Sequence, residues 1–125
     1  MAVSINATLR NNRADAITSF AGTSAKLRIY TAAYATQLVE CVCNAGAFAP
    51  AAAGGGLTLN AISAGTAGNT GTAAIARIYK SDGTTMVIEG LTVGTSGQNI
   101  NLSSTTIAVS DTVTINSATI TEGNA

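Results

Sequence analysis

The chain contains no histidine and no tryptophan, and only 10% of its 125 residues are charged. Histidine is the usual general base near neutral pH, so its absence excludes catalysis by Ser-His-Asp or Cys-His arrangements. Six basic residues balance six acidic ones. A nucleic-acid surface needs clustered Lys and Arg, so the sequence predicts no nucleic-acid partner.

The carboxylates are scattered along the chain, and no two of them are placed like a hydrolytic pair. Asp82 and Asp111 fall in predicted turns, where Asp is common for structural reasons. The glycine-rich segments "AAAGGGL" and "VGTSGQN" lack the Gly-Lys-Ser/Thr ending of a phosphate loop. The sequence also lacks a dense cluster of oxygen ligands for calcium. We therefore predict that the chain is not an enzyme, with no catalytic residue, cofactor or bound metal.

Long apolar runs are missing as well, so we expect no membrane partner. The segment "MAVSINATLRNN" lacks the regions of a secretory signal, and we expect a soluble protein made in a cytoplasm. The two cysteines, Cys41 and Cys43, would face the same side of a strand. Without histidine or further cysteines to complete a zinc site, reduced thiols packed as small apolar residues are the favoured interpretation. A redox or metal role is the alternative.

What the chain has instead is small residues. It is 46% hydrophobic but only 4% aromatic, so its core must be built largely from small side chains. The length predicts a single domain over residues 1–125, with an N-terminal arm and helix over 1–22 and a β-sandwich over 23–125. A thin core of this kind favours an oligomer or a partner surface that completes the burial.

The segment "LRNNRADAITSF" (residues 9–20) has the only clear helical period. Ser4 or Asn6 is expected to cap this helix, and Gly22 to end it. The face predicted to pack on the domain consists of Leu9, Arg13, Ala16, Ile17 and Phe20.

Everything after Gly22 is typical of short strands and turns. The segment "AKLRIYTA" alternates, which places Leu27 and Ile29 on one face, and "ARIYKSDGTTMVIEG" is typical of a hairpin that turns at Ser-Asp-Gly. Roughly eight strands and one helix predict a mainly β fold. The expected architecture is an antiparallel β-sandwich, jelly-roll or Ig-like, with a short N-terminal α-helix.

The tripeptide Arg-Ile-Tyr occurs twice, at residues 28–30 and 77–79. In each copy the isoleucine is expected to face the core, while Arg and Tyr share a half-exposed face. An Arg stem can lie beside a Tyr ring on such a face. The motif therefore indicates a kind of strand and needs no chemical role.

The connector "AGAFAPAAAGGG" (residues 45–56) has low complexity and holds the only proline, Pro50. Its Phe48 is one of two phenylalanines. A lone aromatic residue in such a loop either fills the protein's own core or contacts a partner. The first alternative is favoured, and the second stays open.

The helix "LRNNRADAITSF", the strand "AKLRIYTA", the hairpin "ARIYKSDGTTMVIEG" and the tail "LTVGTSGQNINLSSTTIAVSDTVTINSATITEGNA" together resemble a group of small virion proteins of tailed bacteriophages. The resemblance covers nearly the whole chain except the connector. It implies a structural protein of the phage particle, most like a capsid decoration or cement protein on the outer shell. The chain would then be made in the cytoplasm of the bacterial host. The group has no catalytic residues.

This resemblance implies two partners, the major capsid protein and further copies of the chain in a dimer or trimer. The contacts are expected from the N-terminal segment and the connector, through Ile5, Leu9, Arg10, Arg13, Phe48, Pro50 and Leu57. The alternative is a tail or fibre module that binds a host-surface carbohydrate. That function would need exposed aromatic rings, and Tyr34 is the obvious candidate.

Overall fold

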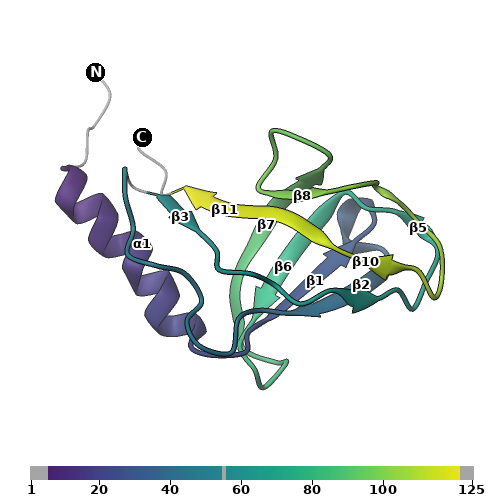
Figure 1. The fold of residues 1–125 in the computed structure, drawn as a ribbon, viewed down its shortest axis with the longest axis horizontal. Helices are drawn as coiled ribbons and strands as arrows, with labels where there is room; N and C mark the ends of the chain where they lie inside the picture. Colours follow the sequence, from purple (N-terminus) through teal and green to yellow (C-terminus); the bar gives the residue numbers. More distant parts are fainter. Residues whose placement is uncertain (1–5, 55, 122–125) are drawn as a thin grey trace.

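The computed structural model describes residues 6–54 and 56–121, and this part of the chain forms one α-helix followed by short strands (Figure 1). The elements are α1 (Ala7–Ala21), β1 (Lys26–Tyr30), the 3₁₀ turn η1 (Ala32–Tyr34), β2 (Gln37–Val42), β3 (Gly56–Thr58), β4 (Gly65–Thr66), β5 (Gly71–Thr72), β6 (Ile75–Tyr79), β7 (Met86–Gly94), β8 (Ile100–Leu102), β9 (Thr106–Ile107), β10 (Thr112–Val113) and β11 (Ile115–Thr121). The mainly β fold with an N-terminal helix confirms the fold class that the sequence predicts.

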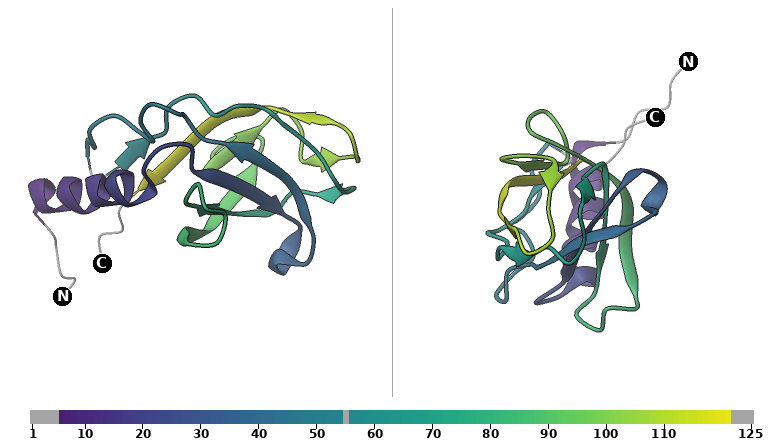
Figure 2. Two further views of the ribbon diagram at one scale, coloured as in Figure 1. Left: turned by 90° about the horizontal axis from the view of Figure 1, so that it is seen from below. Right: turned by 90° about the vertical axis from the view of Figure 1, so that its right-hand side faces the viewer.

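Seven of the described strands form one curled sheet in the order β2-β1-β6-β7-β8-β11-β3, and the remaining strands pair as β4 with β10 and β5 with β9. In the end-on view of Figure 2 the strands wrap around a common interior, which gives the domain its sandwich-like form. The helix α1 lies at one end of this body, beside β3 and the end of β11 (Figures 1 and 2).

One strand pair departs from the expected antiparallel arrangement. β7 and β8 run parallel, with Val93 opposite Ile100. The short loop between them folds back because Asn99 bonds to both sides. Its Oδ1 accepts a hydrogen bond from the backbone N–H of Thr92 (3.1 Å), and its Nδ2 donates to the carbonyl of Thr119 (3.2 Å). The sequence indicates a bend here, but the strand direction depends on these side-chain bonds.

The edge of the sheet at β2 is covered by the segment that contains β4. The backbone N–H of Ser63 donates to the carbonyl of Val42, and that of Gly68 donates to the carbonyl of Leu38, both at 2.9 Å. Between them, a side chain at Gly65 would collide with the carbonyl oxygen of Glu40. Glycine is needed at this position because the two backbones approach too closely for a Cβ atom. The chain thus seals one of the two sheet edges with its own backbone.

The ends of α1 agree with the sequence. The side chain of Asn6 caps the helix by accepting a hydrogen bond from the N–H of Thr8 (2.9 Å), and the chain leaves the helix at Gly22 with φ of 69°. Within the described residues, no helix has both the length and the apolar character needed to cross a membrane.

The predicted packing face of α1 is wrong except for Ile17, which packs against the core. Ala14 and Ala21 are buried and Ile17 is half-buried, whereas Leu9 and Phe20 are 51% and 49% exposed. Small alanine side chains let the helix axis approach the sheet, which a Leu or Phe on that face would prevent. Leu9 and Phe20 therefore face outward, whereas Ile17 packs partly against the core.

The core is continuous through the sheet and reaches the connector. As predicted, Leu27 and Ile29 of β1 are buried, and both are 0% exposed. The largest fully buried side chain is Phe48, which is 1% exposed. Phe48 therefore fills the protein's own interior, which is the favoured alternative from the sequence.

This difference between the two phenylalanines generates a prediction. Phe48→Ala should lower the free energy of unfolding by roughly 3–5 kcal/mol, because it leaves a cavity in a thin core. Phe20→Ala, at an exposed position, should lower it by less than about 1 kcal/mol. Urea denaturation of the two variants at low protein concentration gives the comparison, and equal losses would contradict the assignment of Phe48 to the core.

Candidate binding surfaces

The structure brings together the two segments that the sequence predicts to contact a partner. Nη2 of Arg10 donates a hydrogen bond to the carbonyl of Gly54 (3.4 Å). The backbone N–H of Ala52 donates to Oδ1 of Asp15 (2.7 Å). These bonds hold the connector against one side of α1, as the adjacent ribbons in Figure 1 also show.

A groove of about 350 Å³ opens beside this junction, at the end of the seven-stranded sheet. We call it the connector groove; it is lined by Pro50, Ala51, Ala53, Gly56, Leu57, Thr58, Thr119 and Thr121. None of these side chains carries a charge. The groove therefore presents small apolar groups and hydroxyls.

The groove exists because the connector pairs with the β3 region at two points and bulges away between them. Gly56 and Ala53 exchange two backbone hydrogen bonds (3.0 and 3.1 Å), and the N–H of Asn60 donates to the carbonyl of Phe48 (3.0 Å). Thr58 lies between these two points. No hydrogen bond joins its backbone to the described part of the connector, so this short stretch of sheet edge faces the groove.

Two of the seven predicted contact residues are buried, and a third falls outside the part of the chain that the structure describes. Ile5 lies outside the described residues. The side chains of Phe48 and Leu57 are 1% and 2% exposed and belong to the core, so in this conformation they are not offered to a partner. Leu57 forms part of the inner wall of the connector groove. From the sequence both residues are expected contacts, although core filling is favoured for Phe48, because a low-complexity loop does not show which of its residues turn inward.

The other four predicted residues occupy two different surfaces. Pro50 is exposed at the connector groove, and Arg10 is half-buried against the connector. Leu9 and Arg13 are exposed on the far side of the helix from the connector. We call this second surface the helix stripe; it consists of Leu9, Arg13, Ala16 and Phe20.

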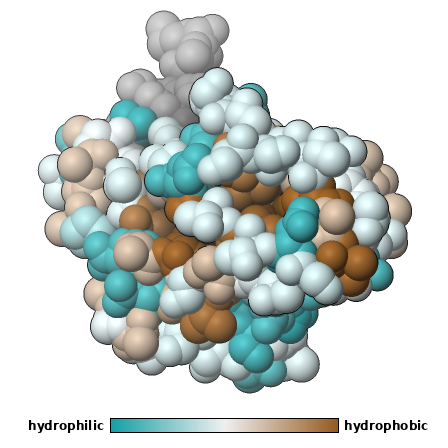
Figure 3. Space-filling view, turned by 45° about the vertical axis from the view of Figure 1, so that its right-hand side comes forward, coloured by the Kyte–Doolittle hydropathy of each residue, from teal (hydrophilic) through white to brown (hydrophobic). Residues whose placement is uncertain are grey.

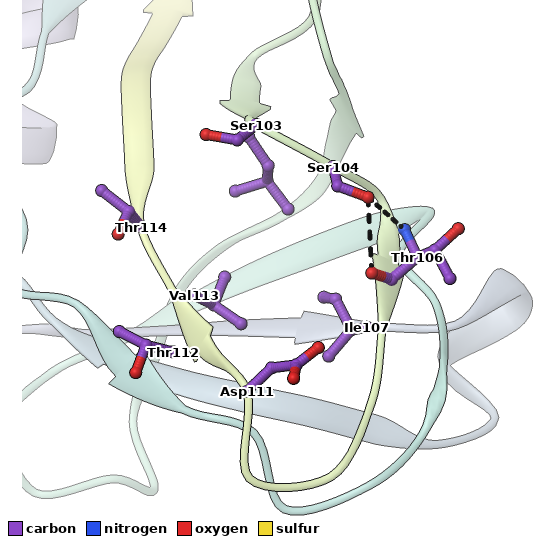
Figure 4. Close-up of a pocket in the computed structure, with 9 residues that line it drawn as sticks. Ser103, Ser104, Thr106, Ile107, Asp111, Thr112, Val113 and Thr114 are labelled. Atoms are coloured by element: carbon purple, nitrogen blue, oxygen red, sulfur yellow. Dashed lines mark hydrogen bonds between the residues drawn. The ribbon is translucent and has the colours of Figure 1, made fainter.

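A third concave surface lies beside β10, at the opposite end of the molecule from α1 (Figure 1), and Figure 4 shows the residues that line it. This hydroxyl pocket has a volume of about 220 Å³. Leu102, Ile107 and Val113 are buried beneath it. In the space-filling view, hydrophobic atoms are recessed among paler polar residues on this side of the molecule (Figure 3). The lining consists of Leu102, Ser103, Ser104, Thr106, Ile107, Asp111, Thr112, Val113 and Thr114.

The polar groups of the hydroxyl pocket are largely used in holding their own loops. Oδ2 of Asp111 accepts a hydrogen bond from the N–H of Ala108 (2.9 Å), which closes the turn before β10. Oγ of Ser104 accepts one from the N–H of Thr106 (3.2 Å), as Figure 4 shows. The sequence did not predict this pocket, because Ser and Thr from separate strands leave no local pattern.

The two Arg-Ile-Tyr copies lie side by side. β1 and β6 are antiparallel neighbours, and their register places Arg28 directly opposite Arg77. Cζ of Arg28 lies 4.4 Å from the ring centroid of Tyr79, and Cζ of Arg77 lies 3.7 Å from that of Tyr34 and 5.4 Å from that of Tyr30. Each guanidinium thus stacks on aromatic rings, which offsets the repulsion between the two like charges.

Carboxylates complete this row on both sides. Nε of Arg28 donates to Glu40 on β2 (2.7 Å), and Nε of Arg77 donates to Glu89 on β7 (3.2 Å). The row therefore crosses four adjacent strands in the order Glu40, Arg28, Arg77, Glu89, so the two central arginines are flanked by carboxylates. Burial raises the pKa of Tyr30, and the neighbouring Tyr79 adds to this shift. The motif has a structural function, as the sequence indicates.

The other described carboxylates also accept hydrogen bonds from the chain itself. Asp82 accepts from the N–H groups of Thr84 and Thr85 (both 2.8 Å), and these bonds to the charged form hold its pKa well below the usual range. Within the described residues there is no group of three or more His, Cys, Asp or Glu side chains placed to hold a metal ion. Glu122 lies outside the described residues.

Cys41 and Cys43 are free thiols, 0% and 3% exposed. Burial raises the pKa of both, and it raises that of Cys43 to about 12, with a further contribution from Cys41. The thiol form is therefore favoured at neutral pH, and the thiolate form needed for nucleophilic reactions is suppressed. This agrees with the favoured interpretation of the cysteines as packed apolar residues.

Comparison with known proteins identifies no matching family model, no matching curated protein and no matching solved structure.

The arginine row generates a second prediction. Arg28→Lys should lower the free energy of unfolding by about 0.5–1 kcal/mol, because an ammonium group cannot both stack flat on Tyr79 and pair in plane with Glu40. Glu89→Gln removes only a more exposed ion pair and should have a smaller effect. Urea denaturation measures both, and a larger loss for Glu89→Gln would show that ion pairing, not stacking, stabilises the row.

The thiols generate a third prediction. In the native protein at pH 7.5, both cysteines should react with a colorimetric disulfide reagent at least about 100-fold more slowly than they do in denaturant. The reagent needs an accessible thiolate, whereas the fold buries both thiols and raises their pKa. Rapid reaction of either cysteine in the folded protein would contradict this and would reopen a redox role.

Proposed function

We propose that this chain is a non-enzymatic structural protein of a bacteriophage virion, a capsid decoration protein that binds the outer surface of the shell. It binds the major capsid protein through the connector groove and stabilises adjacent capsomers. The sequence resemblance to small virion proteins supports the class of protein. The main support for the binding site is the connector groove itself, which is an uncharged hollow at an open sheet edge.

The groove is organised before any partner binds. The bonds Asp15–Ala52 and Arg10–Gly54 fix the connector on α1, and Phe48 anchors its first half in the core. A loop rich in Ala and Gly would otherwise lose much conformational freedom on binding. Because the fold has already ordered this loop, more of the contact energy remains for affinity.

The chemistry of the groove suits a protein segment. Its lining of Ala, Pro, Leu and Thr side chains offers no charge to a phosphate, a carboxylate or a cation. The open stretch of edge at Thr58 offers main-chain groups of the kind that pair with an extended peptide. An exposed strand or loop of a shell protein, with one small apolar side chain directed into the hollow, fits both features. Many weak contacts of this kind, repeated over a lattice, hold a decoration protein in place.

The alternative, a tail or fibre module that binds carbohydrate, is less well supported. Stacking on a sugar ring needs a free aromatic face. Tyr79, Tyr34 and Tyr30 each already have a guanidinium against the ring, and Tyr30 is only 8% exposed. The phenol oxygen of Tyr34 also accepts a hydrogen bond from the N–H of Gly90 (2.8 Å). The obvious carbohydrate candidate is thus occupied by the protein's own groups.

A fourth prediction tests the groove. Ala51→Arg places a long charged side chain at an exposed position of the groove, and it should weaken binding to phage heads that lack the protein by at least about tenfold. Binding is measured by co-sedimentation of purified protein with heads prepared from a phage in which its gene is deleted.

Ala108→Arg is the matched control, because it adds the same side chain at an exposed position at the other end of the molecule. It should bind as the unaltered protein does. If Ala51→Arg binds equally well, the groove is not the contact. If the unaltered protein does not bind heads at all, and instead binds tails or a glycan array, the decoration function itself is wrong.

A further inference from the structure

The helix stripe holds two large apolar side chains, Leu9 and Phe20, which the described part of the chain leaves about half exposed. With 100° between successive residues of a helix, Leu9, Arg13, Ala16 and Phe20 fall within an arc of about 60°. Arg10 and Asp15, which hold the connector, lie on other sides of the helix. The stripe and the connector groove are therefore separate surfaces.

The spacing of the stripe is that of a helix–helix seam. Its members follow one another at steps of four, three and four residues, which is the a/d pattern of a coiled coil over two heptads. Leu9 and Phe20 stand at the two ends with about half of each side chain exposed, and the small Ala16 lies between them. A second helix can therefore lie along the stripe without disturbing the packing of Ala14 and Ala21 on the sheet.

The pattern is complementary to itself in one orientation. If two copies of α1 lie antiparallel about a two-fold axis between Ala14 and Asp15, Leu9 of each copy faces Phe20 of the other. The same axis places Arg13 opposite Ala16, so the long side chain meets the small one. In the parallel orientation Leu9 would face Leu9, Phe20 would face Phe20, and the two Arg13 charges would meet directly. The antiparallel pair avoids these like-with-like contacts.

We propose that the helix stripe binds a second copy of this chain, through an antiparallel two-fold pair of α1 helices. A helix of this length spans about 22 Å, and two such helices in contact bury roughly 500 Å² in total. A stable interface needs about 1,200 Å² or more. The pair is therefore weak in free solution and becomes effective where copies are already held close together. Its use in joining neighbouring copies on a shell rests on the proposed function, but the contact itself is measured without any shell.

The test exploits the fact that positions 9 and 20 lie too far apart on one helix to touch, whereas the pair places them in contact between copies. Leu9→Lys and Phe20→Glu should each raise the dimer dissociation constant by at least about tenfold, because each places a charge against an apolar side chain of the other copy. Lys80 lies 4.6 Å from the Phe20 ring and gives the new glutamate a partner within its own chain, which preserves the fold. Sedimentation velocity over a concentration series gives the constants, and circular dichroism verifies folding.

The double variant, Leu9→Lys with Phe20→Glu, should return the dissociation constant to within about threefold of the unaltered value, because each lysine then faces a glutamate of the other copy. An equimolar mixture of the two single variants should associate more strongly than either alone. Val109→Lys, at a similarly exposed position at the far end of the molecule, is the control and should leave association unchanged.

Three outcomes would overturn the proposal. One is the absence of concentration-dependent association of the unaltered protein even at about 1 mM, where a weak pair should be detectable. Another is normal association of both single variants. The third is a folded double variant that stays monomeric, because this would exclude the antiparallel register. Head binding through the connector groove would be unaffected by any of these outcomes, so the two proposals fail separately.

Discussion

The hydrogen bond from the backbone of Ala52 to the carboxylate of Asp15 joins parts of the chain that are 37 residues apart, and both outer surfaces at this end of the molecule depend on it. It ties a loop with little intrinsic order to a helix that is itself held to the sheet by only two buried alanines and a half-buried isoleucine. With the loop on one side of α1, the large apolar residues of the helix are left on another. One carboxylate therefore shapes the connector groove and keeps it apart from the helix stripe.

The small side chains of the core account for the close contacts between backbone segments in this fold. With so few aromatic residues, close backbone approach replaces bulky side chains. Gly65 against Glu40 and Ala14 of α1 against the sheet are two examples. Phe48 of the connector fills interior space that the small side chains of the strands do not fill. The outer face is stiffened differently, by the row that runs from Glu40 through Arg28 and Arg77 to Glu89. Stability is thus spread over close backbone contacts and one polar row.

Local features of this fold could be predicted from the sequence, and features that need distant partners could not. The inward faces of Leu27 and Ile29, the caps at Asn6 and Gly22, and the turn at Asp82 follow from periodicity and turn chemistry. The packing face of α1 could not be predicted, because periodicity does not reveal that small residues are needed where helix and sheet meet. The connector groove depends on bonds between the connector, α1 and β3, and the parallel pairing of β7 with β8 depends on Asn99. No local pattern encodes these.

The asymmetry of the two sheet edges bears on how this protein behaves at high concentration. Growth of fibrils by strand addition requires that every molecule offer two open edges, one to accept the previous molecule and one to present to the next. Here the edge at β2 is sealed by residues 63–68, and the other edge is open only over a short stretch at Thr58. Pairing through these two edges can therefore join two folded molecules but cannot continue to a third. In a chain this poor in repulsive charge, that arrangement limits edge-to-edge assembly of the folded protein.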